Sequence, residues 1–200
     1  MKCLFHLSLL LSALAISCGR PPAPPAPPAT IHAVAVLPPN NRTDDPLLFK
    51  NDLFWDPFAR RSKPVTVADC LAAEARAQLE QRGFSVSSPE EVEKAIGSRP
   101  PENPQEAAAL ATQGKLSGSV LYLEIKRWEP DMPIRPARVL VTMEASLIDT
   151  ATGQVVWTGH QALQPMPTPG AINLWSAYMI VAHNVVASLL SPWGPEQPSS

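Results

Sequence analysis

A proline-rich tract near the N-terminus limits what this chain can fold into more than any other feature does. Six of the eight residues at positions 21–28 are proline. Proline fixes φ and lacks a backbone N–H, so the tract can adopt only polyproline II or coil. Such a segment extends by about 3.1 Å per residue and serves as a spacer. A PxxP ligand for a recognition domain is the alternative interpretation.

The composition leaves room for one ordinary domain after this spacer. The chain has 200 residues, of which 45% are hydrophobic and 17% charged, enough to bury a core. Nine glycines exclude a collagen-like chain, and the hydrophobic share excludes disorder throughout. A net charge of −2 lacks the basic character of nucleic-acid-binding proteins, so we expect no nucleic-acid partner.

The residues before the spacer predict a signal peptide at 1–17. A lysine precedes an apolar run of 13 residues, positions 4–16, which is short for a membrane span. The run ends in Ala15-Ile16-Ser17-Cys18, which resembles the lipobox of bacterial lipoproteins. The resemblance implies that Cys18 is lipidated and begins a tether at 18–30. An ordinary secretory signal cleaved at Ser17 or later is the alternative.

The lipobox resemblance also carries an expectation about location. Two or three acyl chains give a stable membrane anchor, unlike a single chain. Position 19 is Gly, not the Asp that favours inner-membrane retention in enterobacterial lipoproteins. We therefore expect a lipid-anchored protein of the cell envelope, on the outer membrane and facing the periplasm.

Cysteine usage agrees with this assignment. Cys3 leaves with the signal peptide and Cys18 takes the lipid, which leaves Cys70 as the only thiol. No intramolecular disulfide and no cysteine-based metal site can then form. Cys70 shares a helical face with apolar residues and has no histidine near it in sequence, so we interpret it as a structural thiol rather than a nucleophile.

Residues 31–191 predict a single α/β sandwich domain, a mixed sheet of about five strands flanked by helices. Hydrophobic patterning indicates strands at 31–37, 84–87, 119–128, 137–149 and 154–163. Helices are expected at 66–83, 88–97, 103–114 and 171–190, and residues 40–64 read as a long irregular connection. Residues 192–200 are expected to form a flexible tail.

Local signals support several of these elements. Thr66 with Asp69 forms a capping-box pattern, and Ser88 before Pro89 marks a second helix start. Alternating apolar residues at 139, 141, 143, 145 and 147 predict a strand with one core-facing side.

The C-terminal helix, residues 171–190, carries no formal charge. We expect its apolar residues to cover one face of the sheet; they are Ile172, Trp175, Met179, Val186 and Leu190. A helix that faces a partner or another copy is one alternative. A membrane span is another, although polar residues interrupt the segment and no Lys or Arg flanks it.

A family resemblance rests on the segments VAVLPPNNRTDD, LEQRGFSVSSPEEVEKA, LSGSVLYLEIKRW and SLIDTATGQVVWTG. Together they resemble periplasmic lipoproteins with a TolB N-terminal-like domain. That superfamily includes penicillin-binding-protein activators, curli-secretion lipoproteins and uncharacterised lipoproteins known as surface antigens. Its most specific motif here is Asp149, Thr152, Gly153 and Trp157. The resemblance implies an α/β fold that binds other envelope proteins or assembles, and no catalytic residues.

The sequence contains no recognisable chemistry. Nucleophile elbows, zinc-peptidase motifs and glycine-rich phosphate loops are absent from it. The mature chain has three histidines, His32, His160 and His183, without ligand spacing. We therefore predict no catalytic residue, no metal site, no cofactor and no enzymatic activity.

The irregular connection at 40–64 is rich in large apolar side chains. Phe49, Phe54, Trp55 and Phe58 lie in it, close to basic residues. Aromatic residues dominate interface cores, so these four are our candidate partner-binding residues. The alternative is that they fold back as a lid over the sheet edge.

Two functional hypotheses follow. The first is a non-enzymatic lipoprotein that docks on, or assembles into, an envelope complex for secretion, transport or wall synthesis. The second is a periplasmic small-molecule or wall-fragment binding module, or a hydrolase whose site is scattered in sequence. An exposed apolar patch would favour the first, and polar residues converging in one cleft the second.

Overall fold

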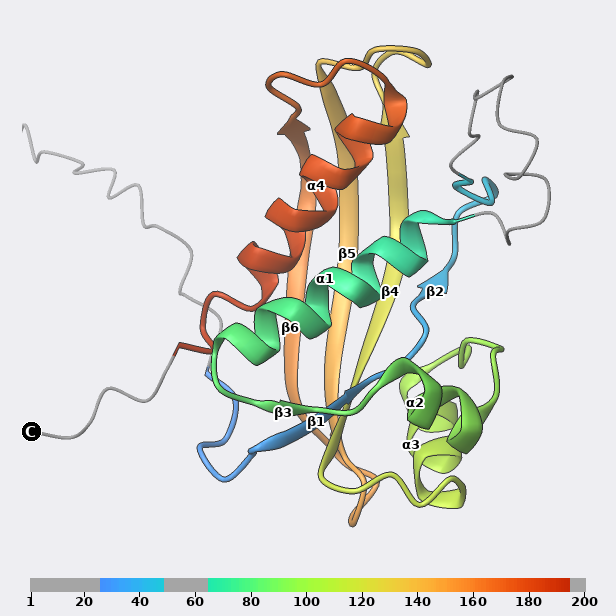
Figure 1. Ribbon diagram of the computed structural model, residues 1–200, viewed down its shortest axis with the longest axis vertical. Coiled ribbons are helices and arrows are strands. Elements are labelled where there is room, and N and C mark those ends of the chain that lie inside the picture. Colours follow the sequence, from blue (N-terminus) through green and yellow to red (C-terminus); the bar gives the residue numbers. More distant parts are fainter. Residues whose placement is uncertain (1–25, 49–64, 195–200) are drawn as a thin grey trace, which may run out of the picture.

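The computed structural model describes residues 26–48 and 65–194, which form a six-stranded mixed sheet with four helices (Figure 1). In spatial order the strands are β3 (Ser85–Val86), β1 (Ala33–Val36), β4 (Ser119–Pro130), β5 (Arg138–Asp149) and β6 (Val155–Pro167), and β2 (Asn40–Asn41) pairs with β4. The helices are α1 (Val67–Gln81), α2 (Pro89–Ile96), α3 (Pro104–Gln113) and α4 (Leu174–Leu189). The predicted α/β class and mixed sheet are confirmed.

The short strand β1 lies at the centre of the parallel part of the sheet. It pairs in parallel with β3 on one side and with β4 on the other. Val34, Ala35, Val36 and Leu37 are all at most 1% exposed, as expected for a strand covered on both faces. The predicted central strand is therefore confirmed.

The long strands β4, β5 and β6 form an antiparallel meander. The alternating residues of β5 from Val139 to Leu147 are each at most 1% exposed, so this predicted core face is confirmed. In the turn to β6, Asp149 Oδ1 accepts backbone hydrogen bonds from Ala151 (2.7 Å) and Thr152 (3.2 Å). Gly153 has φ +69°, a conformation that glycine adopts without strain. The specific motif of the resemblance thus builds a turn.

Two capping boxes fix the starts of helices, as the sequence predicts. The Thr66 hydroxyl accepts from the Asp69 N–H at 3.1 Å, and Asp69 Oδ2 accepts from the Thr66 N–H at 2.8 Å. Ser88 and Glu91 repeat this exchange at α2. Each exchange satisfies backbone donors that a helix otherwise leaves unpaired at its first turn.

The sheet separates two hydrophobic cores. Val34 and Val36 face a large core that α1 and α4 cover, whereas Ala35 and Leu37 face a smaller core covered by α2 and α3. The large core extends along the whole meander. The small core reaches only Val120, Tyr122 and Ile148 of the long strands. Of the helices in the described part of the chain, only α1 and α4 cover the outer part of β4 and β5, and they lie on one face.

Helix α4 lies on the sheet beside α1, but not with the face that the sequence predicted. Ile172 is 73% exposed, Trp175 52% and Met179 40%, so the prediction is wrong for these three residues. Val186 and Leu190 are each 1% exposed, so it is confirmed for the other two. Asn173 caps the helix, which leaves Ile172 outside it. The buried stripe of the helix combines alanine and valine with two larger residues; it comprises Ala177, Tyr178, Val181, Ala182, Val185, Val186 and Leu189. Within the described ranges, no helix combines the length and the hydrophobicity of a membrane span.

The packed domain continues past its predicted end at residue 191. Trp193 is 1% exposed, and its ring makes an edge contact with Trp157, with centroids 4.9 Å apart. It also packs against Phe84 at 5.6 Å. The expectation of a flexible tail from residue 192 is thus wrong at its start, because an indole of this size fills a gap between β6 and the α1–β3 turn.

Candidate functional site

The predicted site residues lie outside the described part of the chain. Cys18 precedes residue 26, and Phe49, Phe54, Trp55 and Phe58 fall between residues 48 and 65. Lipidation at Cys18 and partner binding by the four aromatic residues stay predictions.

The other residues with reactive or metal-binding side chains do not lie close together in the described part of the chain. His32 precedes β1, His160 is on the edge strand β6, and His183 is on α4, where its Nδ1 lies 2.8 Å from Glu74 Oε1. In residues 26–48 and 65–194, no three His, Cys, Asp or Glu side chains are grouped to hold a metal ion. Burial, followed by the charge of Asp69, raises the pKa of Cys70 to about 11, so the thiol is unreactive at neutral pH.

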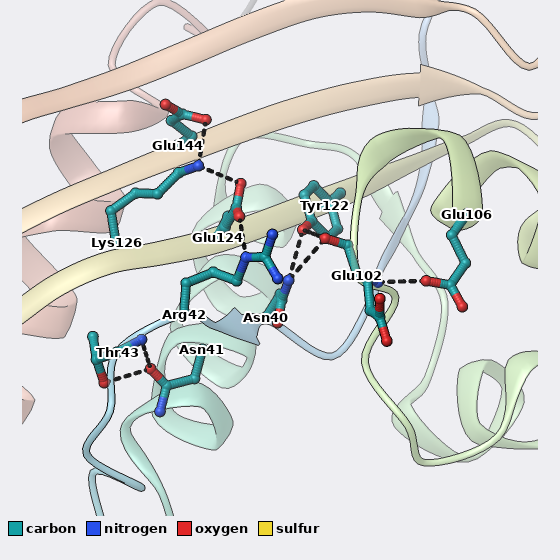
Figure 2. Close-up of polar contacts among 10 residues, drawn as sticks. All are labelled: Asn40, Asn41, Arg42, Thr43, Glu102, Glu106, Tyr122, Glu124, Lys126 and Glu144. Carbon is teal, nitrogen blue, oxygen red and sulfur yellow. Dashed lines mark hydrogen bonds and ion pairs between the residues drawn. The ribbon is translucent and has the colours of Figure 1, made fainter.

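A polar network does converge at the boundary of the small core (Figure 2). At its centre is Glu124 of β4, whose side chain is 9% exposed. Its Oε1 accepts from Arg42 Nε at 3.0 Å, and its Oε2 lies 3.0 Å from Lys126 Nζ. Lys126 also reaches Glu144 Oε2 at 3.4 Å. Because Glu124 and Glu144 are directly opposed on neighbouring strands, the shared lysine offsets their repulsion.

A second set of contacts ties the loop between α2 and α3 to the sheet. Asn40 Nδ2 donates to the Glu102 carbonyl at 3.0 Å and to the Tyr122 hydroxyl at 3.1 Å, and Tyr122 donates to the same carbonyl at 3.2 Å. Figure 2 shows the three residues meeting at one point. Burial raises the pKa of Tyr122, so the phenol stays protonated and acts as a fixed hydrogen-bond group.

Two clefts open on either side of β2. One, of about 540 Å³, is lined by polar side chains that include Arg42, Thr43 and Arg99. The other, of about 430 Å³, lies between α1 and α2 and is lined mainly by proline and small aliphatic residues. Asn40, Asn41 and Pro100 line both. Both volumes are in the range of small-molecule sites.

A third feature is a group of exposed apolar side chains at one end of the molecule, which we call the apolar tip. It comprises Met132, Ile134, Ile172, Trp175 and Met179, which are 40–79% exposed. The first two are in the turn from β4 to β5, and the others are at the start of α4. Arg135 Nε donates to the Ala171 carbonyl at 3.1 Å and holds the two segments together at the upper end of Figure 1.

Sequence reasoning missed the network and the tip. Glu124 was the available signal for the network, because it is the only charged residue in the run from Ser119 to Ile125. The sequence predicts an irregular connection at 40–64, but Asn40 and Asn41 form a strand with β4, so the prediction is wrong at its start. The tip depends on the rotation of α4, which the pattern did not predict.

The sequence matches no protein-family model and no curated protein. Solved structures of PelC share its fold. PelC from Paraburkholderia phytofirmans, solved as a dodecamer, is 18% identical with a TM-score of 0.53, over 86% of this chain and 95% of PelC. A PelC variant is 19% identical with a TM-score of 0.50, again over 86% of this chain and 95% of PelC. Lipoprotein GNA1162 from Neisseria meningitidis has a TM-score of 0.44 at 18% identity, over 77% of this chain and 94% of that one. The described domain therefore has the fold of PelC.

Proposed function

We propose that this chain is a lipid-anchored periplasmic lipoprotein that acts, without catalysis, as a docking and assembly component of a cell-envelope complex. The lipobox at Cys18 and the proline spacer support anchorage on the outer membrane, and the resemblance to TolB N-terminal-like lipoproteins supports a binding role. The likeness to PelC is a likeness of fold, and it adds that a domain of this shape can form a large homo-oligomer.

The observation that carries the proposal is the apolar tip. Five large apolar side chains are exposed on the two segments that the contact between Arg135 and Ala171 joins. Large exposed apolar patches on soluble proteins mark interaction sites. Ile134 and Ile172 are 79% and 73% exposed although both belong to the most hydrophobic class of residues. A hot spot needs such large side chains at its centre. We therefore expect this end of the domain to contact a protein partner, either another envelope protein or a second copy.

Charged substitutions at the tip test the proposal. Ile134→Asp and Ile172→Asp should leave the melting temperature within about 2 °C, because neither side chain is buried. They should reduce the sedimenting size of the complex extracted from membranes. Val155→Asp is the control, since Val155 is 44% exposed at the other end of the meander. A complex of unchanged size in both tip variants would refute docking through the tip.

The alternative, a periplasmic module that binds a small molecule or wall fragment, is favoured by one specific observation. The cleft between α1 and α2 has mixed apolar and charged walls and a volume of about 430 Å³. This cleft shares no lining residue with the tip.

A further inference from the structure

The cleft between α1 and α2 lies at a place where sheets of this kind bind ligands. It is lined by Val36 and Pro38, at the carboxyl end of β1. From β1 the chain crosses through α1 on one face to reach β3, and then returns through α2 and α3 on the other face to β4. The connection that leaves β1 and the connection that enters β4 therefore lie on opposite faces of the sheet. In open α/β sheets the crevice at such a point is the usual binding position.

The walls of the cleft are rigid and mainly apolar. Five prolines line it, at positions 38, 39, 46, 89 and 100. Proline has a fixed φ and loses little entropy when a ligand orders it. Ala68 and Ala72 of α1 face the cleft from one side and Val92 of α2 from the other. A preformed apolar wall favours the apolar body of a ligand.

The one cationic side chain that lines the cleft has no hydrogen-bond or ion-pair partner among the described residues. Arg76, on the third turn of α1, lines the cleft and is partly buried. Its guanidinium makes no ion pair within 4.0 Å among the described residues, whereas Arg82, the partly buried C-cap residue of α1, donates to the Gln78 carbonyl at 2.9 Å. Burial lowers the pKa of Arg76, and the more distant Glu80, Glu90 and Asp69 raise it. A guanidinium that is partly removed from water and has no partner among the described residues is a strong binding group for a carboxylate.

We propose that this cleft binds an apolar ligand that ends in a carboxylate, with the carboxylate on Arg76. Two acidic residues, Asp69 and Glu93, also line the cleft. Asp69 is held by the Thr66 capping box, and Glu93 is exposed on α2. Their negative charge repels a phosphate or a polyanion more strongly than it repels a single carboxylate. Two kinds of ligand have an apolar body that ends in a carboxylate: a short-chain fatty acid and the C-terminus of an apolar peptide.

Calorimetric titration of the full chain in detergent tests the proposal. The probes are hexanoate and acetyl-Ala-Ala-Val with a free C-terminus, each beside its neutral amide. At least one acid should bind, and its amide should bind at least tenfold more weakly. Arg76→Gln should weaken binding of the acid at least tenfold, whereas Arg76→Lys should retain most of the affinity for the acid. Glu93→Gln should tighten binding about two- to threefold, because a like charge is removed.

Arg82→Gln is the matched control, because it removes the partly buried arginine that caps the same helix at its C-terminal end but lies outside the cleft. It should leave the affinity unchanged, and unchanged melting temperatures should show that the Arg76 variants fold. Equal binding of acid and amide, loss of affinity in Glu93→Gln, or no binding of either acid would each overturn the proposal. Binding of hexanoate alone would identify a fatty acid as the source, and binding of the peptide alone a C-terminus. Neither result depends on the anchor or the tip.

Discussion

Removing the Trp193 indole should destabilise the domain strongly, although only seven residues of the sequence follow it. Trp193 is 1% exposed and contacts the rings of Trp157 and Phe84 at 4.9 and 5.6 Å. Replacing a buried aromatic residue by alanine costs about 3–5 kcal/mol, which includes the cavity left behind. For a domain of this size that corresponds to a fall in Tm of roughly 6–20 °C. For Trp193→Ala we expect losses of stability and of Tm near the middle of these two ranges.

Urea denaturation followed by circular dichroism measures this loss. Trp193→Phe should lose less, because it keeps ring contacts and removes an indole N–H that has no hydrogen-bond partner among the described residues. Trp175→Ala is the control, since its indole is 52% exposed and truncation there removes less buried surface. A Trp193→Ala variant within about 1 kcal/mol of the unmodified chain would refute the view that residues 192–194 belong to the core.

The remaining predictions concern the anchor, the aromatic connection, the network and the thiol. Cys18→Ala should release the chain from the membrane fraction and block processing to the lipidated size; firm sedimentation with membranes would refute the lipobox assignment. The double variant Phe54→Ala with Trp55→Ala should lose a partner at unchanged Tm if the connection is an interface, or lose thermal stability if it is a lid. Glu124→Gln should cost about 1–2 kcal/mol in urea denaturation, less than a fully buried pair, because both cations are partly exposed. In a chain that begins at Thr30, Cys70 should react with iodoacetamide about 100-fold more slowly at pH 8 than in urea, and the rate should rise towards pH 11, because burial raises the pKa of the thiol to about 11.

Features that depend on neighbouring residues were predictable from the sequence. The capping boxes at Thr66 and Ser88 work through side chains three residues apart, and the structure contains both. The alternation of β5 requires only that one face be buried, so the five core residues of that strand were identified correctly. The two-residue strand β2 was missed because it is too short to show a period.

Features that depend on long-range packing were not predictable. The contact between Arg42 and Glu124 joins residues 82 positions apart, and no local pattern links them. The rotation of α4 is set by its contact with α1, where Gln78 Nε2 donates to the His183 carbonyl at 3.2 Å. A helix as uniformly apolar as α4 has no strong polar face, so its pattern could not show which stripe would be buried.

The position of the polar network follows from the unequal lengths of the two helical layers. α1 and α4 cover one face of the meander along its length, whereas α2 and α3 reach only Tyr122 and Ile148 on the other. Beyond that limit the same face of β4 continues with Glu124, which is buried by Arg42 and Lys126 rather than by a helix. The Glu124 carboxylate at this boundary is paired with two cations whose side chains are partly exposed to solvent. The strand therefore extends beyond the small core without leaving a buried charge unpaired. The same boundary opens the clefts beside β2, which is why polar and apolar walls meet there.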